Sequence, residues 1–240
     1  MTRNLKALGL ALVAVFAMSA VAASGASAQQ GFLTADGPVT LDGTEVGEPQ
    51  DNGLTSYGGA TRCSHVTYTG HKLNSTPEPP TPKELIPSGS TQLTLTPHYV
   101  GCASQSGESS FPMTIEMTSC DYNLTLESTT ESPEDTYGTD LDVVCENPGD
   151  AIHLTHFAGE SHGFRVCSIT IPAQADLVSH VDVTDQTNGH LLLKGTITGT
   201  DSSRSGLCGA ASTTEGALHL NATVSGTNAD QEPTAIALSE

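Results

Sequence analysis

The sequence contains no tryptophan, has few other aromatic residues and is poor in positive charge. Phe, Trp and Tyr make up 4% of the 240 residues, and eight Lys and Arg stand against 27 Asp and Glu, which gives a formal net charge of −19. Nucleic acids and anionic membrane surfaces bind proteins through clustered cationic side chains. The composition therefore argues against both kinds of partner. It is compatible with a cationic partner, with calcium, and with an acidic surface that serves only solubility.

Once residues 1–28 are set aside, no apolar run in the sequence is long enough to span a membrane. These residues read as a secretory signal peptide, because Arg3 and Lys6 precede the apolar run Leu8–Val21 and the small residues Ala26-Ser27-Ala28 follow it. The run is shorter than the ~20 residues of a transmembrane helix. We expect residues 1–28 to be cleaved and the mature protein to be secreted or extracytoplasmic.

The sequence has no Cys-x-x-Cys motif, which argues against a thioredoxin-type redox pair and against a zinc ribbon. In an exported chain, an even number of widely spaced cysteines predicts structural disulfides. The six are Cys63, Cys102, Cys120, Cys145, Cys167 and Cys208. Three precede Leu126 and three follow Asp140, so complete internal pairing requires at least one bridge between the two halves. The sequence leaves the pairing open; we favour Cys63–Cys102, Cys145–Cys167 and Cys120–Cys208.

An amphipathic helical pattern of useful length is also missing after residue 28. Apolar and polar residues alternate instead, which is the period of a β-strand with one buried face. The alternation is clearest in Phe111–Glu127, where its phase slips by one residue at Ser119. The slip predicts either a β-bulge or a tight reversal. A reversal would place Ile115 opposite Leu124.

Similar alternating segments, bounded by Gly, Pro and Asn, predict short strands along the rest of the chain. They are Val39–Leu41, Thr61–Tyr68, Gln92–Thr96, Leu141–Cys145, Ile152–Phe157, Phe164–Ile171, Val178–Thr184, His190–Thr198 and Leu218–Val224. Pro97 and Pro172 are expected to end strands, and Asn188-Gly189 gives the best hairpin signal. Thr200–Thr213 reads as a Gly/Ser loop. The predicted fold is all-β, a disulfide-stapled antiparallel β-sandwich or barrel of roughly ten short strands.

The predicted domain organisation is one β-rich domain over residues 29–227. The acidic, turn-rich segment 128–139 is the one candidate for a sub-boundary, and residues 228–240 read as a flexible C-terminal tail. The segment Leu73–Ser90 is rich in proline and reads as an exposed, partly polyproline-like loop. It would be the contact arm if the protein were a secreted protease inhibitor.

One stretch matches the nucleophile-elbow pattern G-x-S-x-G, namely Gly159–Gly163 with Ser161 at its centre. In that motif the nucleophilic serine lies on a sharp turn between a strand and a helix. The segment that follows here, Phe164–Ile171, has a strand pattern. A hairpin loop therefore explains these residues better, and a Ser161 hydrolase is an alternative.

Three histidines, His153, His156 and His162, lie close together in the sequence, and neutral imidazole is a ligand for zinc or copper. His153 and His156 are three residues apart, so on one strand they point to opposite faces. No Cys or carboxylate supplies an obvious third ligand. Solvent-facing histidines are the simpler interpretation, and a metalloenzyme built on this cluster is an alternative.

Two groups of residues offer oxygen ligands of the kind that calcium prefers. One group is Asp182, Asp185 and Asn188, and the other is Asp36, Asp42, Glu45, Glu48 and Asp51. Neither has the spacing of an EF-hand loop, so an acidic surface is the simpler interpretation. We assign no metal ligand, no cofactor and no catalytic residue from the sequence. Asn74, Asn123 and Asn221 begin N-glycosylation sequons, which matter only in a host that glycosylates.

Several stretches give the chain a resemblance to a known group of proteins. They are the Ala-rich signal ending ASAQQ, the opening FLTADGPVTLDGT and the segments YTGHK and SCDYNL. In these the chain resembles uncharacterised exported β-rich proteins of high-GC Gram-positive bacteria, which have no assigned activity. The resemblance implies a bacterial, extracytoplasmic setting and no site residues.

No candidate catalytic motif in the sequence has the neighbouring structure that its chemistry requires, and the predicted function follows from this. The sequence favours a non-catalytic binding or cell-envelope-associated β-module rather than an enzyme. A cell-envelope component, a cationic partner and calcium are the ligand classes that it allows. A secreted enzyme that uses Ser161 or the histidine cluster, and a secreted protease inhibitor, are the alternatives.

Overall fold

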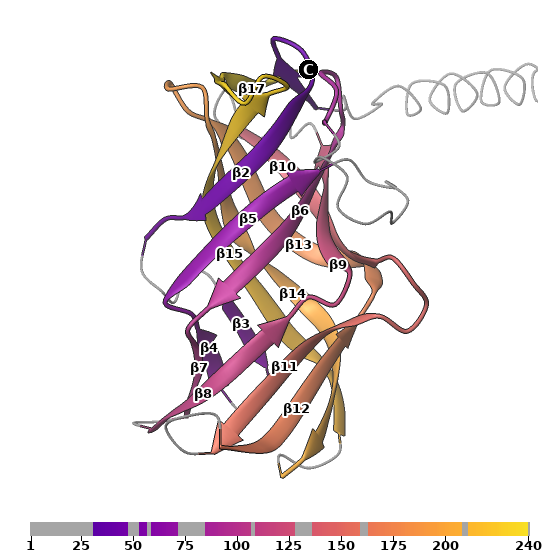
Figure 1. Ribbon diagram of the computed structural model, residues 1–240. Coiled ribbons are helices and arrows are strands. Elements are labelled where there is room, and N and C mark those ends of the chain that lie inside the picture. Colours follow the sequence, from indigo (N-terminus) through magenta and orange to yellow (C-terminus); the bar gives the residue numbers. More distant parts are fainter. Residues whose placement is uncertain are drawn as a thin grey trace, which may run out of the picture.

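The structure, a computed structural model, is built from β-strands (Figure 1). It describes residues 31–47, 53–56, 59–71, 85–106, 109–127, 136–158, 163–207 and 211–239, and these contain no helix. The strands are β1 (Phe32–Ala35), β2 (Val39–Glu45), β3 (Gly53–Ser56), β4 (Gly59–Arg62), β5 (His65–His71), β6 (Gln92–Val100), β7 (Cys102–Ser106), β8 (Ser109–Glu116), β9 (Cys120–Glu127), β10 (Thr136–Cys145), β11 (Ala151–Ala158), β12 (Phe164–Pro172), β13 (Gln174–Asp185), β14 (Leu191–Gly206), β15 (Ala211–Asn228), β16 (Pro233–Thr234) and β17 (Ile236–Ser239).

Fifteen of these strands form one antiparallel sheet, and β1 pairs with β17 in a separate two-stranded sheet. The order in the large sheet is β16-β15-β2-β5-β6-β9-β10-β13-β14-β12-β11-β8-β7-β4-β3. Two additional pairings, of β15 with β14 and with β3, close this order into two circuits of hydrogen-bonded strands. We call β15-β2-β5-β6-β9-β10-β13-β14 the upper ring and β14-β12-β11-β8-β7-β4-β3-β15 the lower ring, after their places in Figure 1.

The chain passes from one ring to the other after almost every hairpin. β2 belongs to the upper ring, β3 and β4 to the lower, β5 and β6 to the upper, and this alternation continues to β13. The level at which the chain crosses is called the waist below. The hairpin of β14 and β15 is shared by both rings, because its strands of 16 and 18 residues are about three times the usual strand length. Its upper part pairs with β13 and β2, and its lower part pairs with β12 and β3.

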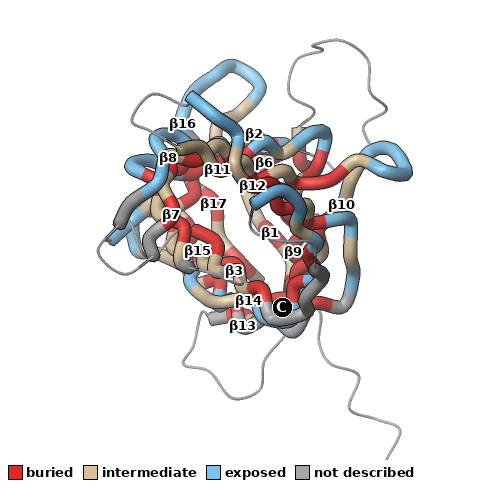
Figure 2. Tube along the Cα trace, turned by 90° about the horizontal axis from the view of Figure 1, so that it is seen from below, coloured by how far each residue is buried: buried red, intermediate tan, exposed pale blue. Residues whose placement is uncertain are grey.

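Alternation of side chains explains the apolar core. On each strand every second side chain points to the inner side of the sheet, and there the upper ring is packed with large apolar residues. Examples with 1% exposure or less are Leu41, Leu95, Leu124, Leu141, Val183, Leu193 and Val224. Figure 2, which views the molecule from below, shows buried segments along the wall and exposed ones at the connections. Each such burial stabilises the fold by roughly 1.5–3 kcal/mol.

The sheet of β1 and β17 adds buried apolar residues to the upper end of the molecule. Leu33 pairs with Leu238, and Leu33 and Ile236 are almost completely buried. Both carboxylate oxygens of Asp185 accept a hydrogen bond from the backbone N–H of Leu238, at 2.9 and 3.1 Å. The predicted flexible tail, residues 228–240, is therefore wrong for the part that the structure describes. Its apolar alternation covers only four residues, which is too short to be recognised as a strand.

In the segment Phe111–Glu127, the slip in the alternation at Ser119 is a tight reversal of the chain and not a β-bulge. Thr118 and Ser119 have positive φ values of 30° and 56°, and the N–H of Cys120 donates to the carbonyl of Met117 at 2.7 Å. The predicted pairing across this turn is nevertheless wrong. β8 pairs with β7 and β11, whereas β9 pairs with β6 and β10, because the turn lies at the waist and sends the two strands to different rings.

Other strand boundaries also differ from the predicted ones. β6 continues through Pro97, which is tolerated because β6 pairs with β9 only over Gln92–Leu95 and leaves the later residues unpaired on that side. Thr200–Thr213 is not a loop, since β14 extends to Gly206 and β15 begins at Ala211. The hairpins around Asn188-Gly189 and between β11 and β12 are confirmed.

The all-β, antiparallel, disulfide-stapled prediction is thus confirmed in outline. The finer prediction of a sandwich or barrel of roughly ten strands is not clearly met, because the structure contains one large antiparallel sheet of fifteen strands and a separate two-stranded sheet. The candidate sub-boundary 128–139 does not separate two parts of the chain. Residues 128–135 lie outside the described residues, but β9 and β10 on either side pair with each other through Gly138 and Glu127.

Two disulfides fasten the waist. Cys63, between β4 and β5, is bonded to Cys102 at the start of β7, and Cys120 at the start of β9 is bonded to Cys145 at the end of β10. The first pairing was predicted. The second contradicts the predicted Cys145–Cys167 and Cys120–Cys208 pairs, because Cys120 and Cys145 lie directly opposite each other on neighbouring strands.

The second bridge also confirms the expectation that at least one disulfide connects the two halves of the chain, since it encloses residues 126–140. Cys167 is disulfide-bonded as well. Cys208, the remaining cysteine of the sequence, lies outside the described residues.

Candidate functional site

The inner side of the lower ring carries several buried hydroxyl groups beside its buried apolar residues. Buried hydroxyl groups come from Thr61, Ser104, Thr200 and Ser202, all at most 8% exposed. They face inward because they alternate with outward residues on β4, β7 and β14. Ser104 lies opposite Thr61 on one neighbouring strand and opposite Phe111 on the other, so one row across the sheet carries two hydroxyls and an aromatic ring.

Among the described residues, the side chain of His156 contacts this row. Its Nδ1 lies 3.0 Å from Oγ of Ser104, and its neighbours in register are Met113 and Cys167. The hydroxyl of Thr61 donates to Sδ of Met113 at 3.9 Å. Burial lowers the pKa of His156 below its usual value, because the charged imidazolium would lose its hydration. The ring is therefore neutral at pH 7.

A serine hydroxyl beside a neutral imidazole is the pair that nucleophilic catalysis requires. Here the pair is closed off from solvent, since Ser104 is 8% exposed and Nε2 of His156 is buried without a hydrogen-bond partner. Among the described residues, no hydrogen bond joins His156 to a carboxylate that would orient it. The contact therefore acts mainly as a polar tie from β7 to β11 across β8.

The histidines and the serine selected from the sequence do not form a common site in the described residues. His153 contacts Thr170 at 3.4 Å, and His156 contacts Ser104. Ser161 and His162 lie outside the described residues. Within the part that the structure describes, no three or more His, Cys, Asp or Glu side chains are arranged to hold a metal ion.

The acidic groups considered for calcium are likewise separate in function. The carboxylate of Asp185 accepts hydrogen bonds from the backbone N–H of Leu238 in β17. An oxygen of the Glu45 carboxylate lies 3.2 Å from Nδ1 of His65. Asp36 and Asp42 are exposed, and Glu48 and Asp51 lie outside the described residues.

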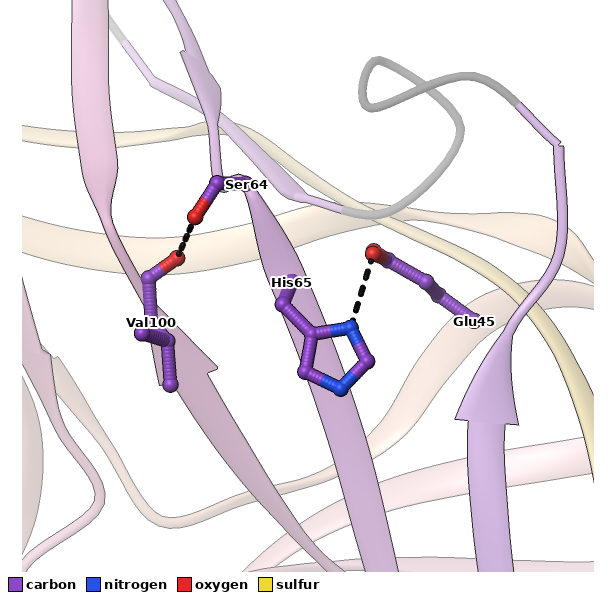
Figure 3. A network of polar contacts seen from close by, with 4 residues as sticks. All are labelled: Glu45, Ser64, His65 and Val100. Carbon is purple, nitrogen blue, oxygen red and sulfur yellow. Dashed lines mark hydrogen bonds and ion pairs between the residues drawn. The ribbon is translucent and has the colours of Figure 1, made fainter.

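A second polar cluster lies at the waist (Figure 3). The His65 ring points toward Glu45, while the hydroxyl of Ser64 donates to the carbonyl of Val100 at 3.0 Å. The second oxygen of Glu45, Oε2, is buried and has no partner. Burial, reinforced by the charge of Glu45 and by Tyr122, raises the pKa of Tyr68. The His65–Glu45 contact joins β5 to β2 and the Ser64–Val100 hydrogen bond joins the start of β5 to the end of β6, so these contacts hold neighbouring strands together, while the unpaired oxygen of Glu45 costs stability.

Three tyrosines fill the inside of the upper ring next to this cluster. The hydroxyls of Tyr99 and Tyr122 are 2.9 Å apart. Burial raises the pKa of Tyr122 to about 12, although its hydrogen bond with Tyr99 acts in the opposite direction. Burial likewise raises the pKa of Tyr99. The three phenols therefore remain protonated at every physiological pH.

The hairpins β7–β8, β11–β12 and β14–β15 end at the lower end of the molecule (Figure 1), and three exposed apolar residues lie at or near these ends. Phe111, Phe164 and Leu207 are 42%, 77% and 87% exposed. The N–H of Leu207 donates to the carbonyl of Val166 at 2.6 Å, so Leu207 lies next to β12, the strand that Phe164 begins. We call Phe111, Phe164 and Leu207 the lower-end apolar group. Val46 and Val100, the other exposed large apolar residues of the described chain, lie at the waist.

Sequence reasoning missed both the inner polar row and the lower-end apolar group. Their members come from strands far apart in the sequence, so no local motif marks them. The one signal in the sequence was the position of Phe164 at the start of a predicted hairpin strand, directly after the Gly-bounded loop. Phe111 is the third residue of β8, which follows residues 107–108, and Leu207 lies in the segment Thr200–Thr213 that was predicted as a loop.

Two other predicted features have outcomes here. Asn123 of one sequon is buried, and its side-chain oxygen accepts a hydrogen bond from Thr94 at 3.1 Å, so it is not available for glycosylation in the folded protein. Of the predicted exposed arm Leu73–Ser90, residues 73–84 lie outside the described residues. Its end is packed, because Ile86 is buried and bonded to Val39.

Comparison with known proteins returns no match, whether with protein-family models, with curated proteins or with solved structures. The part of the chain that the structure describes contains no helix long and apolar enough to cross a membrane.

Proposed function

We propose that the protein is an exported, non-catalytic binding module of the bacterial cell envelope, and that it binds through the lower end of the molecule. The observation that carries this proposal is the lower-end apolar group. Single exposed apolar residues are ordinary on protein surfaces, and we take the presence of three of them at hairpin ends on one end of the molecule as the sign of an interaction surface. Disulfides at the waist suit an oxidising compartment outside the cytoplasm.

The closed state of the one serine–histidine contact also supports binding over catalysis. A substrate would have to reach Oγ of Ser104, which is buried, and an oxyanion site beside it. Among the described residues, neither the inner row of Thr61 and Ser104 with His156 nor the cluster of Glu45 and His65 at the waist offers three side chains that could hold a metal ion.

The test is retention of the secreted protein on isolated cell envelopes. Wild-type protein, a Phe164→Ser/Leu207→Ser variant and a matched Val46→Ser/Val100→Ser variant are incubated with washed envelopes and then sedimented. We expect the wild type and the waist variant to be retained and the lower-end variant to stay in the supernatant. Equal retention of all three, or none at all, would refute the proposal. Circular dichroism checks that each variant is folded.

A second candidate function, a serine hydrolase centred on Ser104, is favoured by the 3.0 Å contact with His156. It is distinguished by labelling with a fluorophosphonate probe. Labelling of the wild type and not of a Ser104→Ala variant would establish the hydrolase. We expect no labelling, because the hydroxyl is buried.

A further inference from the structure

The inner side of β14 changes from apolar to polar at a β-bulge. Ile197 is buried above the bulge, and the buried residues below it are Thr200 and Ser202. Gly199, between them, has a φ of +79°, and the register with β15 shifts there because β14 contains one extra residue. The extra residue turns Thr200 and Ser202 inward. Without it, Asp201 would face the interior of the lower ring.

Arg204 and His156 project from the same inner side. Arg204 is paired with Ile169 of β12, and Ile169 is paired with Leu154 of β11. Both apolar residues belong to the core, and paired residues of neighbouring strands lie on one face of a sheet. His156 follows Leu154 by two positions, so it shares this face.

The lower ring has eight strands, and in a closed ring of that size the strands are tilted. Residues in register are therefore at different heights. Followed from Gly206 through β12, β11, β8, β7, β4, β3 and β15, the pairings return to β14 roughly ten residues nearer its start. Each strand along this path consequently adds slightly more than one residue of height.

This tilt brings the inward polar side chains to one level of the ring. His156 is in register with Gly206 through Cys167, two strands away, and the tilt raises it by about two to three residues, to the height of Arg204. The same drift places Ser104 at the height of Ser202. We call this level the polar level, and its members are Thr61, Ser104, His156, Thr200, Ser202 and Arg204.

The polar level offers hydrogen-bond donors and positive charge. Thr200 is 1% exposed, and neither its Oγ1 nor Nε2 of His156 has a hydrogen-bond partner among the described residues. When the hydroxyl of Ser104 donates to Nδ1 of His156, the proton of the neutral ring is on Nε2, which is then a donor. Arg204 adds a guanidinium to the same side.

Acidic side chains of the lower ring face the other way. Glu116 and Asp201, the acids of its strands whose side chains the structure describes, are exposed. Glu116 is paired with His153, which alternates with the inward Leu154. A cation at the polar level would meet the charge of Arg204 without a described acid to bind it. An apolar molecule would leave the buried hydroxyl and imidazole groups unpaired, which is costly.

We propose that the polar level binds one small inorganic oxyanion, such as phosphate or sulfate, through Arg204, His156 and Thr200. Several oxygens of one anion accept hydrogen bonds from such donors, and the charged guanidinium strengthens its own. The interior of an eight-stranded ring is filled by side chains or holds one small ligand, which limits the size of the anion. This site goes beyond the proposed function and does not depend on it, because it lies inside the ring and not on the lower-end apolar group.

Equilibrium dialysis of the secreted protein against labelled inorganic phosphate, at an ionic strength fixed with sodium chloride, tests the proposal. Arg204→Gln removes the charge, and Thr200→Val removes the hydroxyl while it keeps the shape of the side chain. Arg165→Gln is the matched control, since it removes the same charge from an exposed position on β12. Samples are equilibrated until binding is constant, because the polar level is closed off from solvent.

We expect one phosphate per chain in the wild type and in Arg165→Gln, and displacement by sulfate. Arg204→Gln should weaken binding about tenfold or more, because a hydrogen bond to a charged group is lost, and Thr200→Val should weaken it several-fold. A ligand of the folded state also stabilises it, so phosphate should raise the unfolding temperature of the wild type more than that of Thr200→Val.

The absence of saturable binding up to about 10 mM phosphate would overturn the proposal. So would equal binding by all four proteins, or a loss confined to Arg165→Gln, because the anion would then be held on the surface. Circular dichroism checks the fold of each variant. If Arg204→Gln does not fold, the comparison of Thr200→Val with the wild type decides.

Discussion

Removal of the two disulfides at the waist should have separate and calculable effects on stability. In the chain-entropy view a disulfide stabilises the fold by restricting the unfolded chain, and the effect grows with the logarithm of the enclosed loop. The Cys63–Cys102 and Cys120–Cys145 bridges span 39 and 25 residues. They should therefore contribute about 3.9 and about 3.5 kcal/mol to the free energy of unfolding.

The two loops do not overlap in sequence, so the contributions should be nearly additive. A variant with all four cysteines replaced by alanine should lose about 7 kcal/mol, which is within the total stability of many domains. It is expected to be largely unfolded. Each single-bridge variant should remain folded, because the pairings of β4–β7 and β9–β10 do not depend on sulfur.

Urea unfolding followed by circular dichroism measures these differences, with the midpoint and the slope fitted for each variant. For this test, the sum of the two losses in unfolding free energy matters more than which of the two is larger. If each single-bridge variant lost less than about 1 kcal/mol, the loop-entropy account would be wrong for this protein. If the two losses in unfolding free energy were far from additive, the two disulfides would be energetically coupled and not independent.

Three further outcomes follow from other contacts. Asp185→Asn should destabilise the protein by about 1.5–3 kcal/mol and speed hydrogen exchange at Leu238, because a charge-assisted hydrogen bond to that N–H is weakened; unchanged exchange would contradict this. The lowered pKa of His156 contributes stability that is present above the unfolded pKa of about 6.5 and is lost as pH falls. His156→Gln should flatten this acid dependence, and His98→Gln, at an exposed site, should not. The phenol of Tyr122, whose pKa burial raises to about 12, should stay protonated in absorbance titration at 295 nm until alkaline unfolding begins, with stability falling as pH rises above 10.

Several features of the fold follow from local patterns and were predictable. Strand period, the Asn188-Gly189 turn and the end of β12 at Pro172 each depend on residues adjacent in sequence, and the structure contains all three. The parity of the cysteines likewise required a bridge between the halves of the chain, whatever the pairing. Local preference decides such features because they involve few residues and short loops.

The sequence alone determined that the chain is β-rich, that its cysteines are suited to bridges and that its charge is strongly acidic. It did not determine which ring a strand joins, because each strand carries the same alternation and either ring would bury its apolar face. The positions of Cys120 opposite Cys145, of His156 beside Ser104 and of Leu207 next to β12 depend on that choice. Non-local pairing is settled by the packing of the whole sheet, so only the tertiary structure decided which strands and which side chains lie side by side.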